Sequence, residues 1–330
     1  MDQRAQIGNI LAAPGKIDPV FLATPVLGAP GLDAALGCRV LAKRETENPI
    51  GSFKGRGTEL FVETALHQGE GIVCASAGNF GQGLARAATK RGHACTVFAA
   101  HTANPMKLEA MARLGADVKL AGADFDAAKE AAKHYALERA LRYVEDGAEP
   151  AVAEGAGTIG IELAATHKFD VILVQLGNGA LLSGVGTAIR YAAPEAEIIA
   201  VVAENAPAMK LSLEAGHAIN SATADTIADG MAVRSPIEVS PALLSGCWDL
   251  VAAVSEESML EAMKLARKHL GLILEPSGAA GLAAIISDPD RYRGRHVATI
   301  LCGRNISADM RGRVLAPKCQ PNPSISQKLF

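Results

Sequence analysis

The stretch Asp170-Val-Ile-Leu-Val-Gln-Leu-Gly-Asn-Gly-Ala-Leu-Leu-Ser-Gly184 decides the fold of this chain. It begins with a run that is apolar at nearly every position, which is typical of a strand buried on both faces. A glycine-rich turn and a helical stretch through Tyr191 follow. Strand, turn and helix in this order build parallel sheets that are covered on both sides by helices. We therefore expect an α/β protein.

The same alternation of short β-rich runs and longer helical runs extends over most of the 330 residues. Further strands are predicted at 71–75, 95–99, 117–120, 197–203 and 296–302, and helices at 78–91, 104–114 and 124–142. The segment Asp146-Gly-Ala-Glu-Pro150 is the best candidate for a linker between domains. The proline-rich tail after Ala316 is expected to be a loosely held terminus.

Composition narrows the class of protein. Apolar residues make up 49% of the chain, the formal charge is −3, and no long basic run is present, so neither nucleic acid nor a membrane surface is expected as a partner. No apolar run is long enough to span a membrane, and the N-terminus does not read as a secretory signal. The six cysteines are scattered, which predicts reduced, mostly buried thiols and a cytoplasmic protein. The eight histidines form no zinc pattern.

A candidate nucleophile lies in the run Asn48-Pro-Ile-Gly-Ser-Phe-Lys-Gly-Arg-Gly57. Lys54 is framed by Ser52, Phe53 and glycines, so backbone rather than water surrounds its stem. An amine held in this way can lose its proton and form Schiff bases. A solvated lysine on a turn is the competing interpretation of this run taken alone.

Two glycine-rich turns point to anion binding. Ser76-Ala-Gly-Asn-Phe-Gly-Gln-Gly83 opens a helix, where free backbone N–H groups favour an anion, although a turn that needs glycine for steric reasons has the same pattern. The turn that starts at Gly177 follows a buried strand and suits a phosphate group. It is not a dinucleotide fingerprint, because Leu182 occupies the position of the third glycine.

These motifs occur in a specific order. Ser52-Phe-Lys54, Ser76-Ala-Gly-Asn79, the Gly177 loop, Thr226-Ile-Ala-Asp-Gly-Met-Ala-Val233, Glu275-Pro-Ser-Gly278 and Leu301-Cys-Gly-Arg-Asn305 follow one another along the chain. The series resembles the tryptophan-synthase-β-like superfamily of pyridoxal 5'-phosphate (PLP) enzymes, fold type II, and within it the threonine/serine dehydratases. The resemblance covers roughly residues 20 to 310.

The resemblance implies a role for each motif. Lys54 would hold PLP as a Schiff base and later act as the base at the substrate Cα, and Asn79 would bind the phenolic oxygen of PLP. The backbone of Gly177, Asn178, Gly179, Ala180 and Leu181 would bind the phosphate. Phe53, Gly230, Glu275 and Cys302 would line the ring pocket. The substrate carboxylate would bind at Ser76, Ala77, Gly78, Asn79 and Phe80.

Four positions depart from the family pattern. Cys302 stands where dehydratases usually carry serine, and a neutral thiol does not keep the pyridine nitrogen protonated, which favours elimination. Ala77 replaces the second serine of serine racemases, so racemisation is disfavoured. Phe80 replaces a histidine and makes one wall of the site apolar. Lys210 replaces a later ligand of the metal site that begins at Glu204, so no metal is expected.

The resulting prediction is a PLP-dependent lyase that eliminates water and ammonia from a 3-hydroxy amino acid such as L-threonine or L-serine. Threonine or cysteine synthases are an alternative, but they usually read Lys-Asp-Arg where this chain has Lys54-Gly-Arg56. A non-catalytic PLP-binding protein is a further alternative, against which the intact lysine argues. We expect a large PLP-binding domain from residues 1–45 and 149–330, and a small substrate-binding domain from 46–148, with PLP between them. We also expect a homodimer and, since no chain follows Phe330, no feedback by isoleucine.

Overall fold

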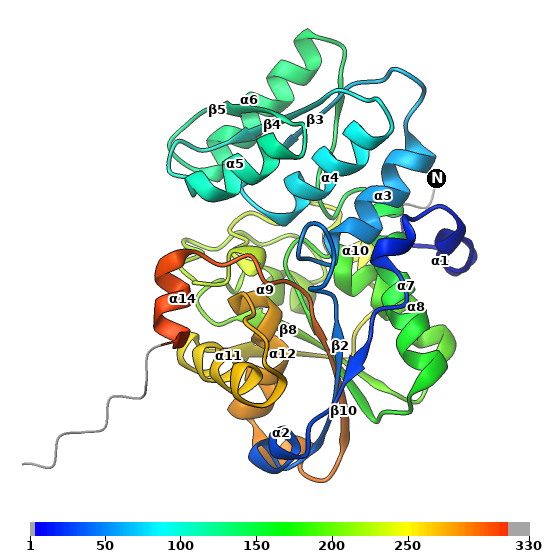
Figure 1. Cartoon of the computed structure of the whole chain (residues 1–330), viewed down its shortest axis with the longest axis vertical. Helices are drawn as coiled ribbons and strands as arrows, with labels where there is room; N and C mark the ends of the chain where they lie inside the picture. The colour runs from blue at the N-terminus through cyan, green and yellow to red at the C-terminus, as the bar shows by residue number, and fades with distance from the viewer. Residues whose placement is uncertain (1–3, 316–330) are drawn as a thin grey trace, which may run out of the picture.

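Two sheets organise the computed structural model, which describes residues 4–315 (Figure 1). The six-stranded sheet has the order β1 (Val26–Leu27), β2 (Arg39–Arg44), β10 (His296–Leu301), β7 (Val171–Gln175), β8 (Glu197–Ala203) and β9 (Leu250–Val254). The four-stranded sheet has the order β5 (Asp117–Leu120), β4 (Cys95–Ala99), β3 (Ile72–Ala75) and β6 (Arg142–Tyr143). Only β1 pairs in the antiparallel sense among these strands of the described chain. The predicted class, α/β with two mostly parallel sheets, is confirmed.

Helices cover both sheets. Figure 1 shows α4, α5 and α6 around the four-stranded sheet, and α11 and α12 beside the larger sheet. The α-helices are α1 (Ile7–Ala12), α2 (Pro30–Leu36), α3 (Lys54–Ala65), α4 (Asn79–Lys90), α5 (Pro105–Arg113), α6 (Phe125–Glu138), α7 (Pro150–Thr166), α8 (Ala180–Ala192), α9 (Ala208–Ala215), α10 (Ser240–Leu243), α11 (Glu256–Leu270), α12 (Pro276–Ser287), α13 (Pro289–Tyr292) and α14 (Ala308–Leu315). Three 3₁₀ turns are η1 (Ala13–Gly15), η2 (Pro19–Phe21) and η3 (Asp229–Met231).

The central strand β7 explains why its sequence is apolar throughout. Val171 and Leu173 face a core cluster that includes residues of α11 and α12. Ile172 and Val174, on the opposite face, belong to a second cluster that includes residues of α7 and α8. Successive side chains of a strand point to opposite faces, so a strand between two helical layers must be apolar at every position.

One predicted helix is too long. The prediction of a helix over 124–142 is wrong at its C-terminal end, because α6 ends at Glu138 and Ala140 has a φ of +52°. This left-handed residue turns the chain so that Arg142 and Tyr143 pair with Ile72 and Val73 as strand β6. Strands β1, β2 and β9 were not predicted. The other predicted strands are present, with ends that differ by at most one residue.

The two sheets draw on different parts of the chain. Residues 72–143 supply all strands of the smaller sheet, and the strands of the larger sheet come from both sides of this segment. The domain limits at residues 46 and 148 stay a prediction. The tail after Ala316 lies outside the described residues, as does Cys319. The remaining five cysteines are free and buried, as expected.

A buried ionic network ties α3 to β2 and α7. The guanidinium of Arg56 is fully buried and donates to both oxygens of Glu45 and of Glu162, at 2.6–2.9 Å. Lys43 donates to the same Glu162 at 2.7 Å. Two positive and two negative charges are thus paired in the interior, which such groups require in order to be buried at tolerable cost. The network fixes the start of α3, where Lys54 lies.

Candidate active site

The candidate site collects chain segments that follow parallel strands. Ser76 follows β3, Leu176 follows β7, and Cys302 follows β10. Ligands of open α/β sheets bind beyond the carboxyl ends of strands, where such loops meet.

In the described chain, no helix is long and apolar enough to cross a membrane. Residues 4–315 also contain no group of three or more His, Cys, Asp or Glu side chains placed to hold a metal ion.

Lys54 is placed by the loop that precedes α3. The side chain of Asn48 accepts the N–H of Ile50 and of Ser52, and its amide donates to the carbonyl oxygens of Glu45 and Ser52, which closes a compact turn. The turn is anchored to the segment after β10, because the Phe53 N–H and the Ser52 hydroxyl both donate to the carbonyl oxygen of Cys302, at 3.0 and 3.1 Å. Lys54 therefore begins α3 next to Cys302.

The amine of Lys54 is held between a carboxylate and two aromatic rings. Its Nζ lies 2.5 Å from Oδ2 of Asp146, and the two side chains are only 15% and 16% exposed. The same Nζ lies 4.8 Å from the ring centre of Phe53 and 5.8 Å from that of Phe80. Lys54 is thus a confined amine rather than a solvated surface lysine, as the sequence predicts.

The Ser76 turn presents backbone N–H groups. The hydroxyl of Ser76 accepts from the N–H groups of Gly78 and Gly81, at 3.2 and 3.0 Å, so it caps the start of α4. Within residues 4–315, the N–H groups of Ala77, Asn79 and Phe80 have no protein acceptor. A Cβ placed on Gly78 would meet no atom within 4 Å, so there is space in front of this turn. Such donors at a helix N-terminus suit a carboxylate.

The Gly177 turn has the properties of a phosphate cradle. Gly179 has a φ of +104°, which glycine adopts readily, and α8 begins directly after it. A Cβ on Gly177 would lie 2.1 Å from the carbonyl oxygen of Gly230, so only glycine fits there. In the part of the chain that the structure describes, the N–H groups from Gly177 to Leu181 donate to no protein acceptor. Converging free N–H groups at a helix start are what a phosphate binds.

Asn79, Glu275 and Asn305 form a hydrogen-bonded group. The Asn79 amide donates to the Glu275 carboxylate at 2.9 and 3.2 Å, and its oxygen accepts from Asn305 at 2.7 Å. The Asn305 backbone N–H donates to Glu275 at 3.1 Å. Burial raises the pKa of Glu275, although the bonds from Asn79 and Asn305 oppose the shift. The side-chain amide of Asn79 thus binds Glu275 and Asn305 in this structure. Its predicted contact with the cofactor stays a prediction.

Burial keeps the thiol of Cys302 neutral. It raises the pKa of this thiol far above its ordinary value, and the negative charge of Glu275 acts in the same direction. A neutral thiol is a weak hydrogen-bonding group and carries no charge with which to stabilise a protonated ring nitrogen. This is the electronic property that the sequence assigns to position 302.

The predicted site residues are linked through space. Phe53 and Phe80 meet at Lys54, Phe53 binds the backbone of Cys302, and Asn79 binds Glu275. The Gly177 turn touches Gly230, and a Cβ on Gly147 would lie 2.1 Å from the carbonyl oxygen of Asn178. The loop that carries Asp146 therefore lies on the phosphate cradle.

Sequence reasoning missed two residues of this site. Asp146 was placed in a linker, and Asn305 was quoted in a motif without a role. The local sequence around Asp146 carries no signal of a site, because the contact that matters joins it to Lys54, 92 positions away.

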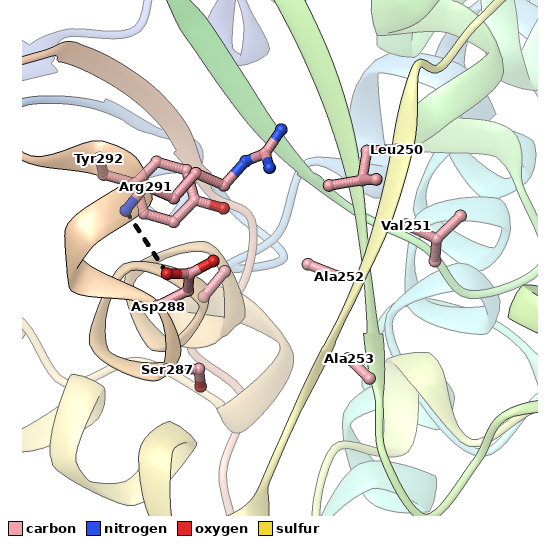
Figure 2. Close-up of a pocket in the computed structure, with 9 residues that line it drawn as sticks. Leu250, Val251, Ala252, Ala253, Ser287, Asp288, Arg291 and Tyr292 are labelled. Carbon is pink, nitrogen blue, oxygen red and sulfur yellow. Dashed lines mark hydrogen bonds between the residues drawn. The ribbon is translucent and has the colours of Figure 1, made fainter.

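A cavity of about 250 Å³ lies elsewhere in the molecule, between edge strand β9 and the segment from α12 to α13 (Figure 2). Leu250 and Ala252 lie on one side of it, and Asp288 and Arg291 on the other. The Asp288 side chain accepts the backbone N–H of Arg291 at 3.4 Å. None of the predicted site residues lines this cavity.

The fold and the site together define a class of protein. A confined amine, a cradle for a phosphate group and a neutral thiol, brought together by loops of parallel strands, fit a phosphorylated aldehyde cofactor such as PLP. The comparison with known families agrees: the model of the pyridoxal-phosphate dependent enzymes matches residues 17–303. The chain belongs to this family, which confirms the predicted cofactor.

Individual relatives refine the comparison. The chain is 34% identical over 287 residues to an L-threonine ammonia-lyase of Thermotoga maritima, and the match covers 86% of this chain and 71% of the relative. It spans about half of the biosynthetic threonine dehydratase of Arabidopsis thaliana, at 32% identity, with 91% of this chain and 52% of the relative covered.

Solved structures share the fold. A threonine deaminase from T.th. superposes with a TM-score of 0.86 at 32% identity, covering 92% of this chain and 99% of the other. A maize serine racemase gives a TM-score of 0.86 at 27% identity, covering 93% and 95%.

Proposed function

We propose that this protein is a PLP-dependent lyase that converts a 3-hydroxy amino acid, such as L-threonine or L-serine, into a 2-oxo acid and ammonia. The observation that carries the proposal is the amine of Lys54, confined beside the cradle at Gly177 in a chain whose relatives include threonine ammonia-lyases. The comparisons support β-elimination from hydroxy amino acids.

Each segment has a proposed task. When bound, PLP supplies an electron sink for the negative charge that develops at the substrate Cα. The N–H groups from Gly177 to Leu181 bind its phosphate. Lys54 attaches the cofactor covalently and then removes the proton from Cα. The free N–H groups around Asn79 orient the substrate carboxylate. Phe80 excludes water from one side.

The overall reaction balances without a further reactant. Lys54 takes the proton at Cα, the β-hydroxyl gains a proton and leaves as water, and one water hydrolyses the released enamine to the 2-oxo acid and ammonia. A screen of 2-oxo acid release over serine, threonine and bulkier 3-hydroxy amino acids tests the proposal. If none is deaminated although PLP is bound, the lyase assignment is wrong, and the synthase and binding-protein alternatives take its place.

Racemisation is the reaction from which elimination must be distinguished, since a serine racemase shares the fold. Ala77 cannot exchange a proton on the face opposite Lys54. Ala77→Ser is expected to raise the ratio of serine racemisation to elimination by at least about tenfold, because a positioned acid–base group contributes roughly 10²–10⁴-fold. Chiral chromatography and 2-oxo acid release measure the two rates.

A serine introduced at the exposed Ala112 of α5 should leave this ratio unchanged. If the unmodified protein already racemises serine faster than it deaminates any 3-hydroxy amino acid, both the lyase assignment and the use of Ala77 to reach it are wrong.

Three expectations complete the proposal. We propose that the enzyme acts in the cytoplasm, which the five cysteines of the described chain support, because all five are free and buried. We propose a homodimer, which light scattering of the purified protein tests. We propose that the residue limits of the two domains are those expected from the sequence, with the small domain spanning 46–148.

A further inference from the structure

Asp146 is a carboxylate that neither the predicted site nor the proposed mechanism uses. It lies between β6 and α7, 92 positions along the chain from Lys54. Its Oδ2 contacts the Lys54 amine at 2.5 Å. Its Oδ1 is buried and has no hydrogen-bond partner among the described residues. A buried carboxylate oxygen without a hydrogen-bond partner lowers the stability of the fold. Its presence next to Lys54 therefore suggests a role at the site.

The loop that carries Asp146 is held in place. The N–H of Val144 donates to the carbonyl oxygen of Val73 at 2.8 Å, and the N–H of Ala148 donates to that of Glu145 at 3.1 Å. Gly147 has a φ of +91° and lies against the carbonyl of Asn178, where a side chain would not fit. Asp146 is therefore fixed next to both the amine and the phosphate cradle.

No other charged group contacts Lys54 in the described chain. Lys54 acts on the Cys302 thiol, which Glu275 and Glu45 also influence, and Asp146 acts on the Cys74 thiol. Burial raises the pKa of both thiols far above the ordinary value, so both are neutral at pH 7. The carboxylate of Glu275 is engaged by Asn79 and Asn305. Asp146 is thus the charged group in direct contact with the Lys54 amine in the described chain.

We propose that Asp146 is a positioning residue for Lys54, with opposite effects on two steps. The inference rests on the proposed function. A carboxylate in contact with an amine stabilises its charged form. Before the cofactor binds, Asp146 holds Lys54 as an ammonium ion and slows its attachment to PLP. During turnover, it stabilises the ammonium ion that forms when Lys54 accepts the proton from Cα, and so speeds that step.

The chemistry of attachment explains why Asp146 would slow the binding of PLP to Lys54. The ammonium ion of Lys54 must lose a proton to solvent before its nitrogen can bond to the aldehyde carbon of PLP, and this condensation releases one water. Because the ion pair with Asp146 stabilises the ammonium form, it must break before the amine can react, and we expect this to slow attachment about tenfold or more.

The variant Asp146→Asn separates these effects from a structural role. In the cofactor-free protein at pH 7, attachment of added PLP, followed by absorbance, should become about tenfold faster, because the ion pair no longer has to break. Once loaded, the variant should lose about 10–100-fold in kcat with a smaller change in KM. A residue that only supports the fold would slow both steps.

Two variants serve as controls. Glu145→Gln removes a carboxylate from the same loop that pairs with Lys129 instead, and it should change neither rate. Asp146→Glu keeps the charge and should restore slow attachment. If PLP attaches to Asp146→Asn at the normal rate or more slowly, with circular dichroism unchanged, the proposal is wrong.

If Asp146→Asn does not fold, Asp146→Ser is measured in its place, with the same expected results. The attachment assay needs only PLP and the cofactor-free protein. It therefore reports on Asp146 even if no 3-hydroxy amino acid proves to be a substrate, and a failure of the proposed function is distinguishable from a failure of this inference.

Discussion

Replacing Lys54 with alanine is expected to lower the release of 2-oxo acid by at least about 10⁴-fold, because one residue supplies both the covalent attachment and the base at Cα. The absorbance band of covalently bound PLP should disappear from the purified variant. The effect is large because Lys54 is the amine confined by Asp146, Phe53 and Phe80.

The matched control is Lys133→Ala, which removes a lysine that is 42% exposed on α6 and pairs with Glu130. This variant should keep both the band and the activity. If Lys54→Ala still forms the band and turns over substrate, another lysine holds PLP, and the site described above is not the active site.

Replacing Arg56 with alanine is expected to cost about 3–5 kcal/mol of stability, because it leaves the buried Glu45 and part of Glu162 without their partner. With an unfolding entropy of about 2.1 cal/mol/K per residue, the thermal midpoint should fall by about 4–7 °C. Differential scanning calorimetry measures the shift. Arg113→Ala is the control, because its pair with Glu109 is more than 60% exposed and should contribute less than about 1 kcal/mol.

The ionic network around Arg56 also makes the stability of the protein depend on pH, through Glu162. Burial raises the pKa of Glu162, but hydrogen bonds and charges from Arg56 and Lys43 outweigh it and lower the pKa to about 2. Because this lies below the ordinary value of 4.5, ionised Glu162 stabilises the fold above about pH 4.5, and the contribution is lost as the pH falls towards 2. In Arg56→Ala this acid dependence should shrink. An unchanged midpoint and an unchanged acid dependence would show that the network contributes little.

The fold could be predicted from the sequence wherever local pattern and tertiary position agree. Val171 to Val174 are apolar because both faces of β7 are covered, and this is visible in the sequence itself. Arg142 and Tyr143 show the opposite case: Arg142 ends the predicted helix, but both residues form a strand because Ile72 and Val73 lie beside them. A pairing across about 70 positions leaves no local signal.

Some residues of the candidate site could likewise be predicted from local sequence, and others could not. Lys54 and the Gly177 turn are recognisable because glycines around a functional group leave a dense local pattern. Asp146 is not, because its importance comes from one contact with a residue 92 positions away. Asn305 is hidden for the same reason, since its partners Asn79 and Glu275 belong to other segments.

Reduction of the PLP-loaded protein with borohydride, followed by peptide mapping, tests the central claim most directly. The reduction makes the bond between the cofactor and its lysine permanent, so the labelled residue can be identified by mass spectrometry. The structure predicts a single pyridoxyl group on Lys54, in the peptide that begins α3. A label on any other lysine, or a protein that binds PLP without becoming labelled, would contradict the account.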